Sequence, residues 1–433
     1  MSFKLKLFNS CFAIASANIL LIATVNAVEW KTEPTISMDM QYNDNVRMRV
    51  DNDNPEGSTG FIFEPRVKLA GIEQHVWDVS IDALGRIIRF QDIEDSDSEN
   101  VFFVFNGGRQ TERTDWRLNT SFERNSNFDT DFDFQNPDAG LLDDHTERKT
   151  KSISPSVSWS ISETSQMSFS LNSTAVSYDE VTNLNLTDYD YDSAQFVASW
   201  QITENQRLGF TSSYAEYESP ETNFSYDQVV FQVDYSFALN QLSKVSLSVG
   251  GRRLDSLRTD VTTGCEVFGE IAPIEDFPGG ICPTSPFFVI TPVVEDIVTE
   301  EDGTVVNVSY NSNSERVNQY FAAGRTVSPS SFGGAQEVLN ATYRFKINNT
   351  ERFSTNILLN ASETETISGI NSSNDRTRYR VEPSVVYRLS KNWNLSFIYR
   401  YIDQTISSSD EESTSNAVFI NLFLHWPKLA TTY

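Results

Sequence analysis

The sequence predicts a transmembrane antiparallel β-barrel of about 18 strands, or about 16 if one hairpin near its cysteines lies outside the wall. Strand-length segments alternate apolar and polar residues, aromatic residues gather on the apolar face beside short turns, and short turns alternate with long acidic loops. Short periplasmic turns and long extracellular loops are typical of outer-membrane barrels. A soluble secreted β-protein is the alternative, and it has no reason to keep that alternation along its whole length.

The N-terminus has the features of a secretory signal peptide at residues 1–27. Lys4 and Lys6 precede an apolar stretch at residues 12–25, and small residues up to Ala27 offer a cleavage site. An uncleaved anchor is the alternative, but the apolar stretch is short for a span of about 20 residues. We therefore expect an exported protein of a Gram-negative bacterium.

Charge and hydropathy restrict how the mature chain can cross a membrane. The formal net charge of −27 disfavours nucleic acid as a partner. Beyond the signal no run of about 18 apolar residues occurs, so strands and not helices are expected to span. In hydrocarbon every backbone N–H and C=O must be paired, so the sheet must close and its last strand must pair with its first.

One hairpin pattern recurs along the chain: a strand, a short polar turn and a second strand. It is found at residues 152–171, 193–212, 228–249 and 379–399. With the other alternating segments, it predicts a barrel over residues 28–426. The expected strands are 30–50, 61–71, 77–90, 101–109, 116–124, 151–161, 167–178, 193–202, 207–217, 226–238, 244–254, a hairpin within 303–327, 335–347, 352–361, 377–389, 393–403 and 416–426. Prolines 34, 65, 155 and 383 are expected near strand ends, where a bulge or solvent can absorb the lost donor.

Aromatic residues on the apolar face near the short turns are predicted to form a girdle at the membrane–water interface. These residues are Trp77, Trp116, Trp159, Trp200, Tyr235, Tyr343, Tyr387, Trp393 and Trp426.

Charged residues of both signs are expected on the lumen side of the wall, which favours a hydrated interior. They are Glu64, Arg66, Lys68, Asp78, Asp82, Asp115, Arg117, Glu123, Arg380, Glu382 and Arg388. A barrel of about 18 strands is wide enough for a channel unless a loop plugs it.

The segment 255–302 interrupts the regular spacing of strands. Cys265 and Cys282 within it are predicted to form a disulfide, because the chain is exported and companion metal ligands are missing. The segment is expected to serve as a plug or lid, or equally as a decorative extracellular loop.

Catalytic and metal-binding patterns are weak, so no enzyme activity and no cofactor are predicted. His75, His145 and His425 have no serine or carboxylate pattern of a catalytic triad around them, which leaves an outer-membrane hydrolase as a less favoured function. The aspartates at positions 129, 131 and 133 lack the glycine and distal glutamate of a helix-loop-helix calcium site. We interpret these acidic loops as solvated.

Three segments resemble a known family: "PTISMDMQYNDNVRM" at residues 34–48, "GRTVSPSSFGGAQEVLNATYRFKINNTERFSTNILL" at 324–359 and "SNAVFINLFLHWP" at 415–427. They are similar to outer-membrane β-barrel proteins associated with exopolysaccharide synthesis and exosortase (PEP-CTERM) gene clusters. The resemblance implies a barrel that assists secretion or assembly of an extracellular polysaccharide and is not an enzyme. The insertion with its two cysteines departs from the family pattern, and a general diffusion porin for small solutes remains the alternative.

The same resemblance implies partners at the cell outer membrane. These are outer-membrane lipid and lipopolysaccharide, the barrel-assembly machinery and polysaccharide export components. The machinery is expected to recognise the aromatic end of the last strand, where Val418, Ile420, Leu422, Leu424 and Trp426 share one apolar face. Residues 427–433 are expected to follow as a periplasmic tail.

Overall fold

The computed structural model describes residues 29–50, 55–73, 76–93, 96–126, 146–179, 186–267, 270–273, 288–369, 375–407, 410–426 and 429–432. They form one 20-stranded antiparallel sheet, in which β12 (Glu270–Pro273) and β20 (Leu429–Thr432) are four-residue pieces. The remaining 18 strands are the wall of a closed barrel, which confirms the predicted fold class. Closure is made by β1 and β19, from Thr35 opposite His425 to Asn43 opposite Ala417.

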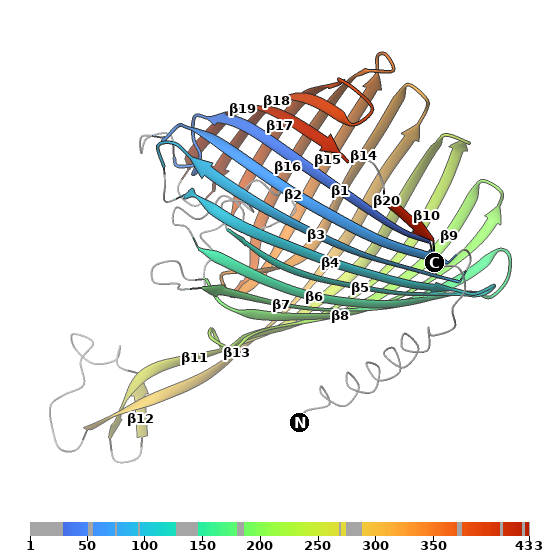
Figure 1. The fold of residues 1–433 in the computed structure, drawn as a ribbon. Helices are drawn as coiled ribbons and strands as arrows, with labels where there is room; N and C mark the ends of the chain where they lie inside the picture. Colours follow the sequence, from blue (N-terminus) through green and yellow to red (C-terminus); the bar gives the residue numbers. More distant parts are fainter. Residues whose placement is uncertain are drawn as a thin grey trace.

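The wall strands follow one another in chain order, each paired with its neighbours (Figure 1). The first nine are β1 (Glu29–Asn43), β2 (Ser58–Glu73), β3 (Trp77–Phe90), β4 (Ser98–Gln110), β5 (Thr114–Ser126), β6 (Glu147–Ser160), β7 (Ser165–Asp179), β8 (Tyr189–Thr203) and β9 (Gln206–Ser219). The others are β10 (Phe224–Asn240), β11 (Ser243–Val267), β13 (Phe288–Asn313), β14 (Val317–Ser330), β15 (Gly334–Asn348), β16 (Phe353–Gly369), β17 (Arg376–Arg388), β18 (Trp393–Ile406) and β19 (Glu411–His425).

Among the described residues, no helix is long and apolar enough to span a membrane.

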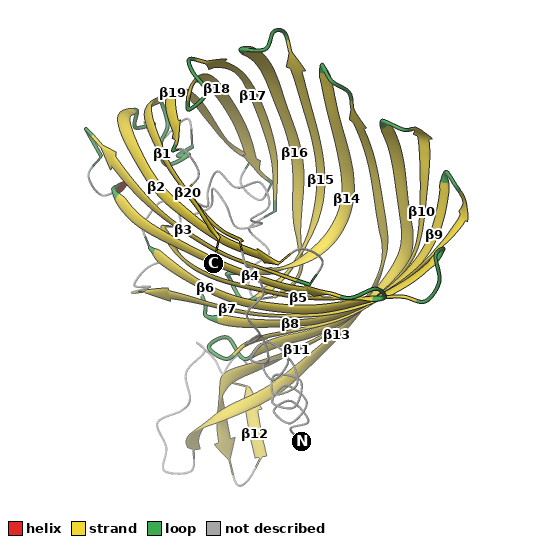
Figure 2. Ribbon diagram, turned by 45° about the vertical axis from the view of Figure 1, so that its right-hand side comes forward, coloured by secondary structure: helices red, strands yellow, loops and turns green. Residues whose placement is uncertain are grey.

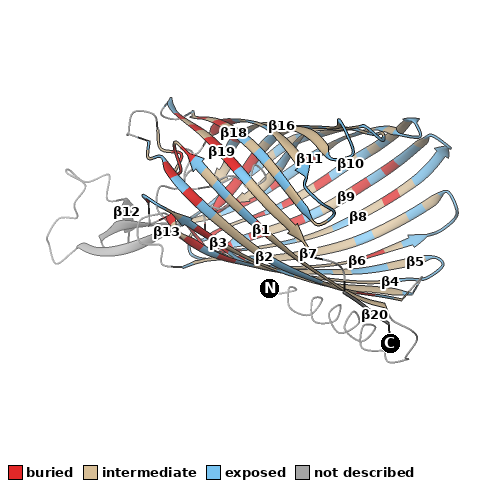
Figure 3. Ribbon diagram, turned by 45° about the horizontal axis from the view of Figure 1, so that its top comes forward, coloured by how far each residue is buried: buried red, intermediate tan, exposed pale blue. Residues whose placement is uncertain are grey.

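The two faces of the wall differ as the alternation in the sequence requires. Along β18, Leu395 and Phe397 lie on the outer face, where 37% and 48% of their surfaces are exposed. Ser396, which lies between them, and Arg400, which follows, face the lumen. Most buried residues lie toward the end of the barrel that carries the long loops (Figure 3). The core of this molecule is therefore at its extracellular end and not at mid-height.

The four strand prolines behave differently from the expectation that they lie near strand ends. At Pro65, Pro155 and Pro383, which lie well inside β2, β6 and β17, the ladder to the next strand is interrupted. Pro34 lies where the partner of β1 changes from β20 to β19. Each proline thus coincides with a local gap in pairing, so the missing N–H donor costs no ladder hydrogen bond.

The segment 255–302 extends a wall hairpin, which differs from the expected plug or lid and leaves the alternative expectation of a decorative extracellular loop in place. The ladder between β11 and β13 runs without a break from Ser243 opposite Ser312 to Val267 opposite Phe288. Beyond the rim, this hairpin projects away from the barrel (Figures 1 and 2). In the part of the segment that the structure describes, the chain leaves the lumen and does not fill it.

The hairpin is attached to wall strands on both sides only near its short turn, then to β10 alone as far as Arg258, and to neither neighbour beyond that residue. β14 pairs with β13 over the short range from Asn313 opposite Asn318 to Asn307 opposite Gly324. Above Gly324 the ladder between β13 and β14 ends, and the upper ends of β14, β15 and β16 contact the inward face of β10 and β11 without pairing with it. The strand count of 18 is confirmed and the alternative of 16 is wrong, because both strands of this hairpin pair within the wall near their short turn.

The overlap creates a two-layered contact that we call the seam. Its inner layer is the outward face of the upper ends of β14, β15 and β16, and its outer layer is the inward face of β7 to β11. Between them lies the main apolar cluster of the described chain, composed of Val176, Tyr189, Tyr217, Phe224, Tyr226, Leu254 and Ala335. Tyr217 and Tyr226 stack with ring centroids 5.0 Å apart. Buried aromatic area of this kind stabilises an overlap that has no backbone ladder.

Candidate functional site

The predicted lumen residues lie on the inner wall, where most form ion pairs across neighbouring strands. Arg66 pairs with Asp82, and Arg86 pairs with Glu64. Arg117 contacts Asp78 at 2.7 Å and Asp115 at 2.8 Å. Glu382 accepts from Arg380 and, at 2.7 Å, from Arg400. These pairs leave the lumen surface hydrated and charged, with little net charge of its own at those points.

Three predicted lumen residues have no ion pair within the described part of the chain: Lys68, Glu123 and Arg388. Two partners that the sequence did not single out, Arg86 and Arg400, complete the pairs above. Both lie within expected strands, 77–90 and 393–403, at positions whose parity faces the lumen. Period two therefore gives the correct face for them. Their partners depended on the strand register, which the sequence leaves open.

A trough that the sequence did not predict lies on the inner wall along β11 and β13 to β17. It consists of two adjoining cavities of about 420 Å³ and 590 Å³. Both are lined by Tyr320, Arg344 and Leu358, so they form one continuous surface. Their sizes lie within the range of about 300 to 1,000 Å³ that is common for small-molecule sites.

Amide and hydroxyl groups from β15, β16 and β17 line the trough. The Asn360 side-chain amide donates to the Thr342 hydroxyl at 2.7 Å, and that hydroxyl donates to the Asn340 side-chain oxygen at 3.2 Å. Lower down, Asn356 donates to the Ser384 hydroxyl at 3.2 Å. Asn356 and Asn360 can form further hydrogen bonds, because each amide has two donors and two acceptor sites. The trough can therefore bind a polyhydroxylated ligand.

A tyrosine and an arginine stand together at the point that both cavities share. The Arg344 guanidinium carbon lies 5.8 Å from the centre of the Tyr320 ring, which is within the range of a cation–π contact. Both side chains are exposed to the lumen. Gly324 lines the larger cavity, and a Cβ added there would stand 2.0 Å from the Asn307 side-chain oxygen. A side chain at position 324 would therefore fill the trough.

The seam contains a buried charge cluster above the trough. Arg252 on β11 pairs with Glu337 on β15, and their side chains are only 3% and 5% exposed. Glu337 also pairs with Arg325, and Arg252 lies 3.2 Å from Glu301. Because the charges are shielded from water, they interact more strongly than surface pairs and hold the two layers in register.

The "SPSSFGG" stretch of the family resemblance forms the turn between β14 and β15, and this turn docks across the barrel. The Tyr217 hydroxyl donates to the Ser330 carbonyl oxygen at 3.1 Å, and the Thr187 amide donates to that of Ser331 at 2.8 Å. Gly333 has φ of +75°, a conformation that L side chains rarely adopt. The turn thereby joins the upper end of β14 to β9 and to the segment that precedes β8.

The structure places the predicted girdle residues on the outer face. Trp116, Trp159, Trp200, Tyr235, Tyr387, Trp393 and Trp426 are exposed, and Trp77 and Tyr343 are half-buried. Trp77 lies beside Trp30, with ring centroids 6.4 Å apart. Most of these side chains lie close to the short turns, as expected.

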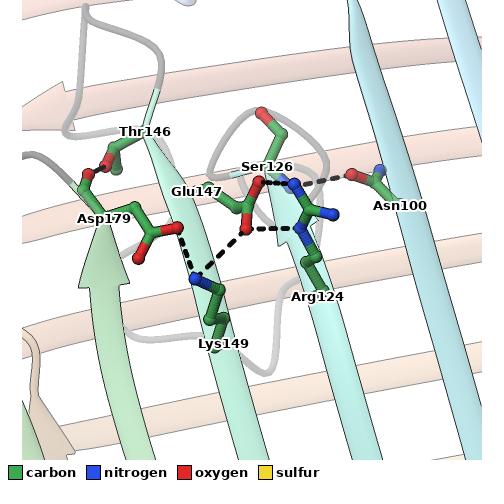
Figure 4. Close-up of polar contacts among 7 residues, drawn as sticks. All are labelled: Asn100, Arg124, Ser126, Thr146, Glu147, Lys149 and Asp179. Carbon is green, nitrogen blue, oxygen red and sulfur yellow. Dashed lines mark hydrogen bonds and ion pairs between the residues drawn. The ribbon is translucent and has the colours of Figure 1, made fainter.

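At the opposite end of the outer face, charged residues replace apolar ones. Arg124, Glu147, Lys149 and Asp179 form a row of ion pairs across the ends of β5, β6 and β7 (Figure 4). The Lys149 ammonium donates a hydrogen bond to Asp179 and lowers the pKa of that carboxyl below its usual value. This row marks where the apolar band of the outer face ends.

Several predicted residues lie outside the described chain. They are the signal peptide, His75, His145, the three aspartates at 129, 131 and 133, and Cys282, so the disulfide stays a prediction. Cys265 is in β11 opposite Ile290. His425 ends β19 opposite Thr35. Across the described ranges, no group of three or more His, Cys, Asp or Glu side chains is placed to hold a metal ion.

The last residues differ from the expected free tail. Leu429–Thr432 form β20, which pairs with β1 from Thr32 back to Glu29. The Trp426 amide donates to the Pro34 carbonyl oxygen at 3.0 Å, between the two ladders. β20 thus continues the closing edge of the barrel toward the short-turn end.

No family model matches this chain, and no curated protein is significantly similar to it. Among solved structures it is similar to OccK2 of Pseudomonas aeruginosa, with 9% identity and a TM-score of 0.45 over 92% of this chain and 98% of that one. It is also similar to OccAB2 of Acinetobacter baumannii, with 11% identity and a TM-score of 0.45 over 92% of this chain and 98% of that one. A third similar structure is the ferric-catecholate import receptor Fiu of E. coli K12, with 8% identity and a TM-score of 0.44 over 90% of this chain and 81% of that one. These likenesses concern the fold alone. By its own strand pairing and apolar outer face, the chain has the fold of an outer-membrane β-barrel.

Proposed function

We propose that the protein is an outer-membrane channel for hydrophilic solutes. The observation that supports this most is the contrast between its two faces: an outer face of exposed apolar side chains, and an inner wall lined by cross-strand ion pairs, amides and hydroxyls. A water-soluble protein rarely exposes so large an apolar surface, and a barrel with a packed core is lined by apolar side chains on its inner wall. Both are expected where lipid surrounds a water-filled lumen.

The finer proposal is that the solutes are glycans and that the barrel assists secretion or assembly of an extracellular polysaccharide. Two observations support it. The family resemblance points to exopolysaccharide gene clusters, and the trough offers the amides, hydroxyls and aromatic ring that suit sugar rings. On this proposal, the outer membrane of a Gram-negative cell is the location, and polysaccharide export components are the partners.

General diffusion of small solutes is the second candidate, and the charge-balanced inner wall favours it. Because most lumen charges are paired, the wall away from the trough has little preference between cations and anions. A porin of this kind needs no binding site, whereas a glycan channel does.

Purified protein in planar bilayers, combined with deletion of its gene, tests these proposals. A channel for hydrophilic solutes should show steady open conductance. If the solutes are glycans, deletion should reduce surface polysaccharide and leave uptake of small solutes intact; for a general porin, uptake should fall and polysaccharide should stay constant. A closed channel together with normal polysaccharide would contradict both.

A further inference from the structure

We infer that the trough binds a sugar unit that carries a carboxylate, with Arg344 holding the carboxylate and Tyr320 packing against the sugar ring. This inference deepens the proposed function, since it requires that glycans enter the lumen. It names the chemical class of the ligand: a uronic-acid residue, alone or within a chain.

The first step is the unbalanced positive charge at the trough. Some inner-wall arginines, such as Arg66 and Arg117, have carboxylate partners, whereas Arg207 and Arg388 have none in the described chain. In the described chain, Arg344 and Lys346 have none, although the whole protein carries a net charge of −27. Carboxylates are abundant in this chain, yet none pairs with these two cations. Two unpaired cations in one recess attract an anion from solution.

The second step is the geometry of Arg344. Its guanidinium lies over the Tyr320 ring, and stacking holds the planar group while leaving its N–H edge free. A planar fork of N–H groups binds a carboxylate through two parallel hydrogen bonds. The contact with Tyr320 therefore orients the Arg344 guanidinium and leaves its N–H groups available to bind a carboxylate.

The third step is the surface beside the arginine, which suits hydroxyl groups. Asn360, Thr342 and Asn340 form a hydrogen-bonded row above Arg344, and Asn356 and Ser384 lie on the other side. Because these groups already order one another, they offer fixed donors and acceptors to a ring of hydroxyls. A bare inorganic anion would use Arg344 alone and leave this surface unused.

Space for the sugar comes from small residues on β14. Ala322 and Gly324 line the larger cavity, at positions where most strand residues would carry larger side chains. A Cβ at position 324 would collide with Asn307, as described above. The hollow extends upward from Tyr320, so a sugar held by Arg344 has room for the next unit of its chain.

The test is block of single-channel current by oligogalacturonate, by a neutral maltooligosaccharide of equal length and by inorganic phosphate. We expect the uronate to block for about ten times longer than the neutral sugar, because a hydrogen bond to a charged group is worth about one order of magnitude in affinity or more. Phosphate should cause no resolved block. Equal block by the uronate and neutral oligomers, or equal block by phosphate, would overturn the inference.

Variants locate the effect. Arg344→Gln should shorten the uronate block about tenfold and leave the block by the neutral sugar unchanged, while Tyr320→Leu should shorten both. Arg207→Gln is the matched control, because Arg207 faces the lumen from β9, also without an ion pair in the described chain, and lies far from the trough. If Arg207→Gln shortens the uronate block as much as Arg344→Gln, the trough is not the site.

Folding and channel activity are controlled separately. Arg344→Lys keeps the charge but loses the planar fork, so its block should be intermediate, and each variant should keep the heat-sensitive mobility of a folded barrel on gels. Open conductance with no preference for uronate refutes only this inference. Absence of conductance in the unmodified protein refutes the proposed channel itself.

Discussion

Arg252 and Glu337 form a buried ion pair although their strands, β11 and β15, never pair with each other. Arg252 belongs to the inward face of β11, whereas Glu337 belongs to the outward face of β15. Two such faces can meet only if the upper end of β15 lies inside β11. The pair thus shows that the wall overlaps itself at its extracellular end.

Replacing Arg252 by methionine should destabilise the barrel by about 3 kcal/mol, because removing one partner leaves the Glu337 carboxylate buried with less compensation. Thermal unfolding, followed by the heat-sensitive mobility on gels, measures the loss. The control is Arg253→Gln at the next position, where the side chain is 53% exposed and pairs with Asp255 on the outer face. A loss at Arg253 equal to that at Arg252 would contradict the buried seam.

A cysteine pair at positions 256 and 368 should cross-link the seam. The two serine hydroxyl oxygens are 2.7 Å apart, although one residue is on β11 and the other on β16. Ser256→Cys with Ser368→Cys, made with both Cys265 and Cys282 replaced by serine, should oxidise to an intramolecular disulfide that a reductant reverses. We expect unchanged conductance, because an apolar cluster already holds the layers together. A failure to cross-link would show that the layers do not meet there.

Gly333→Ala should loosen the turn between β14 and β15. A Cβ at Gly333 would stand 2.8 Å from the Thr222 methyl carbon, and a φ of +75° costs a side-chain-bearing residue about 1 to 2 kcal/mol. Faster cleavage of the turn by protease and a lower unfolding temperature should follow. Gly85→Ala is the matched control, since its Cβ would meet nothing nearer than the Pro65 ring at 3.8 Å; equal effects of the two changes would exclude a steric origin.

Replacing Leu424 and Trp426 by serine should lower the outer-membrane level of the protein far more than deleting residues 429–433. Leu424 lies in the closing ladder between Ile36 and Trp393, whereas β20 contributes only four residue pairs to β1. Immunoblots of outer-membrane fractions measure the difference. The reverse order would mean that β20, and not the apolar end of β19, directs assembly.

The predicted disulfide between Cys265 and Cys282 can be tested by mass spectrometry of the intact protein before and after reduction. A gain of two hydrogens on reduction is expected, with loss of that shift in Cys265→Ser. Free thiols in the unreduced protein would refute the pairing.

The sequence predicted the wall well because its signal is local. Alternation along each strand decides which side chains face lipid, so the lumen positions of Arg66, Asp78 and Glu382 followed from period two alone. The strand count followed equally from turn residues. None of these steps required knowledge of which strands meet across the barrel.

The seam and the trough escaped prediction because both depend on contacts between distant strands. Glu337 has the parity of a lipid-facing residue, and nothing near it in sequence indicates that β11 will cover it. The valines and threonines of the segment 255–302 suit a strand, but its prolines and cysteines suggested a loop. Tyr320 and Arg344 could be assigned to the lumen face by parity, yet their contact depends on the register of β14 with β15.

The seam also gives one wall two girths. At the short-turn end all 18 strands stand side by side, whereas above Gly324 the upper ends of β14, β15 and β16 lie inside β10 and β11, so the overlapped strands no longer each add to the circumference. Since the diameter of a barrel grows with the number of strands in its ring, the lumen tapers toward the long loops. For the channel proposed above, the upper ends of β14, β15 and β16 would set the largest solute that can pass, so one wall would supply both the pore and its constriction.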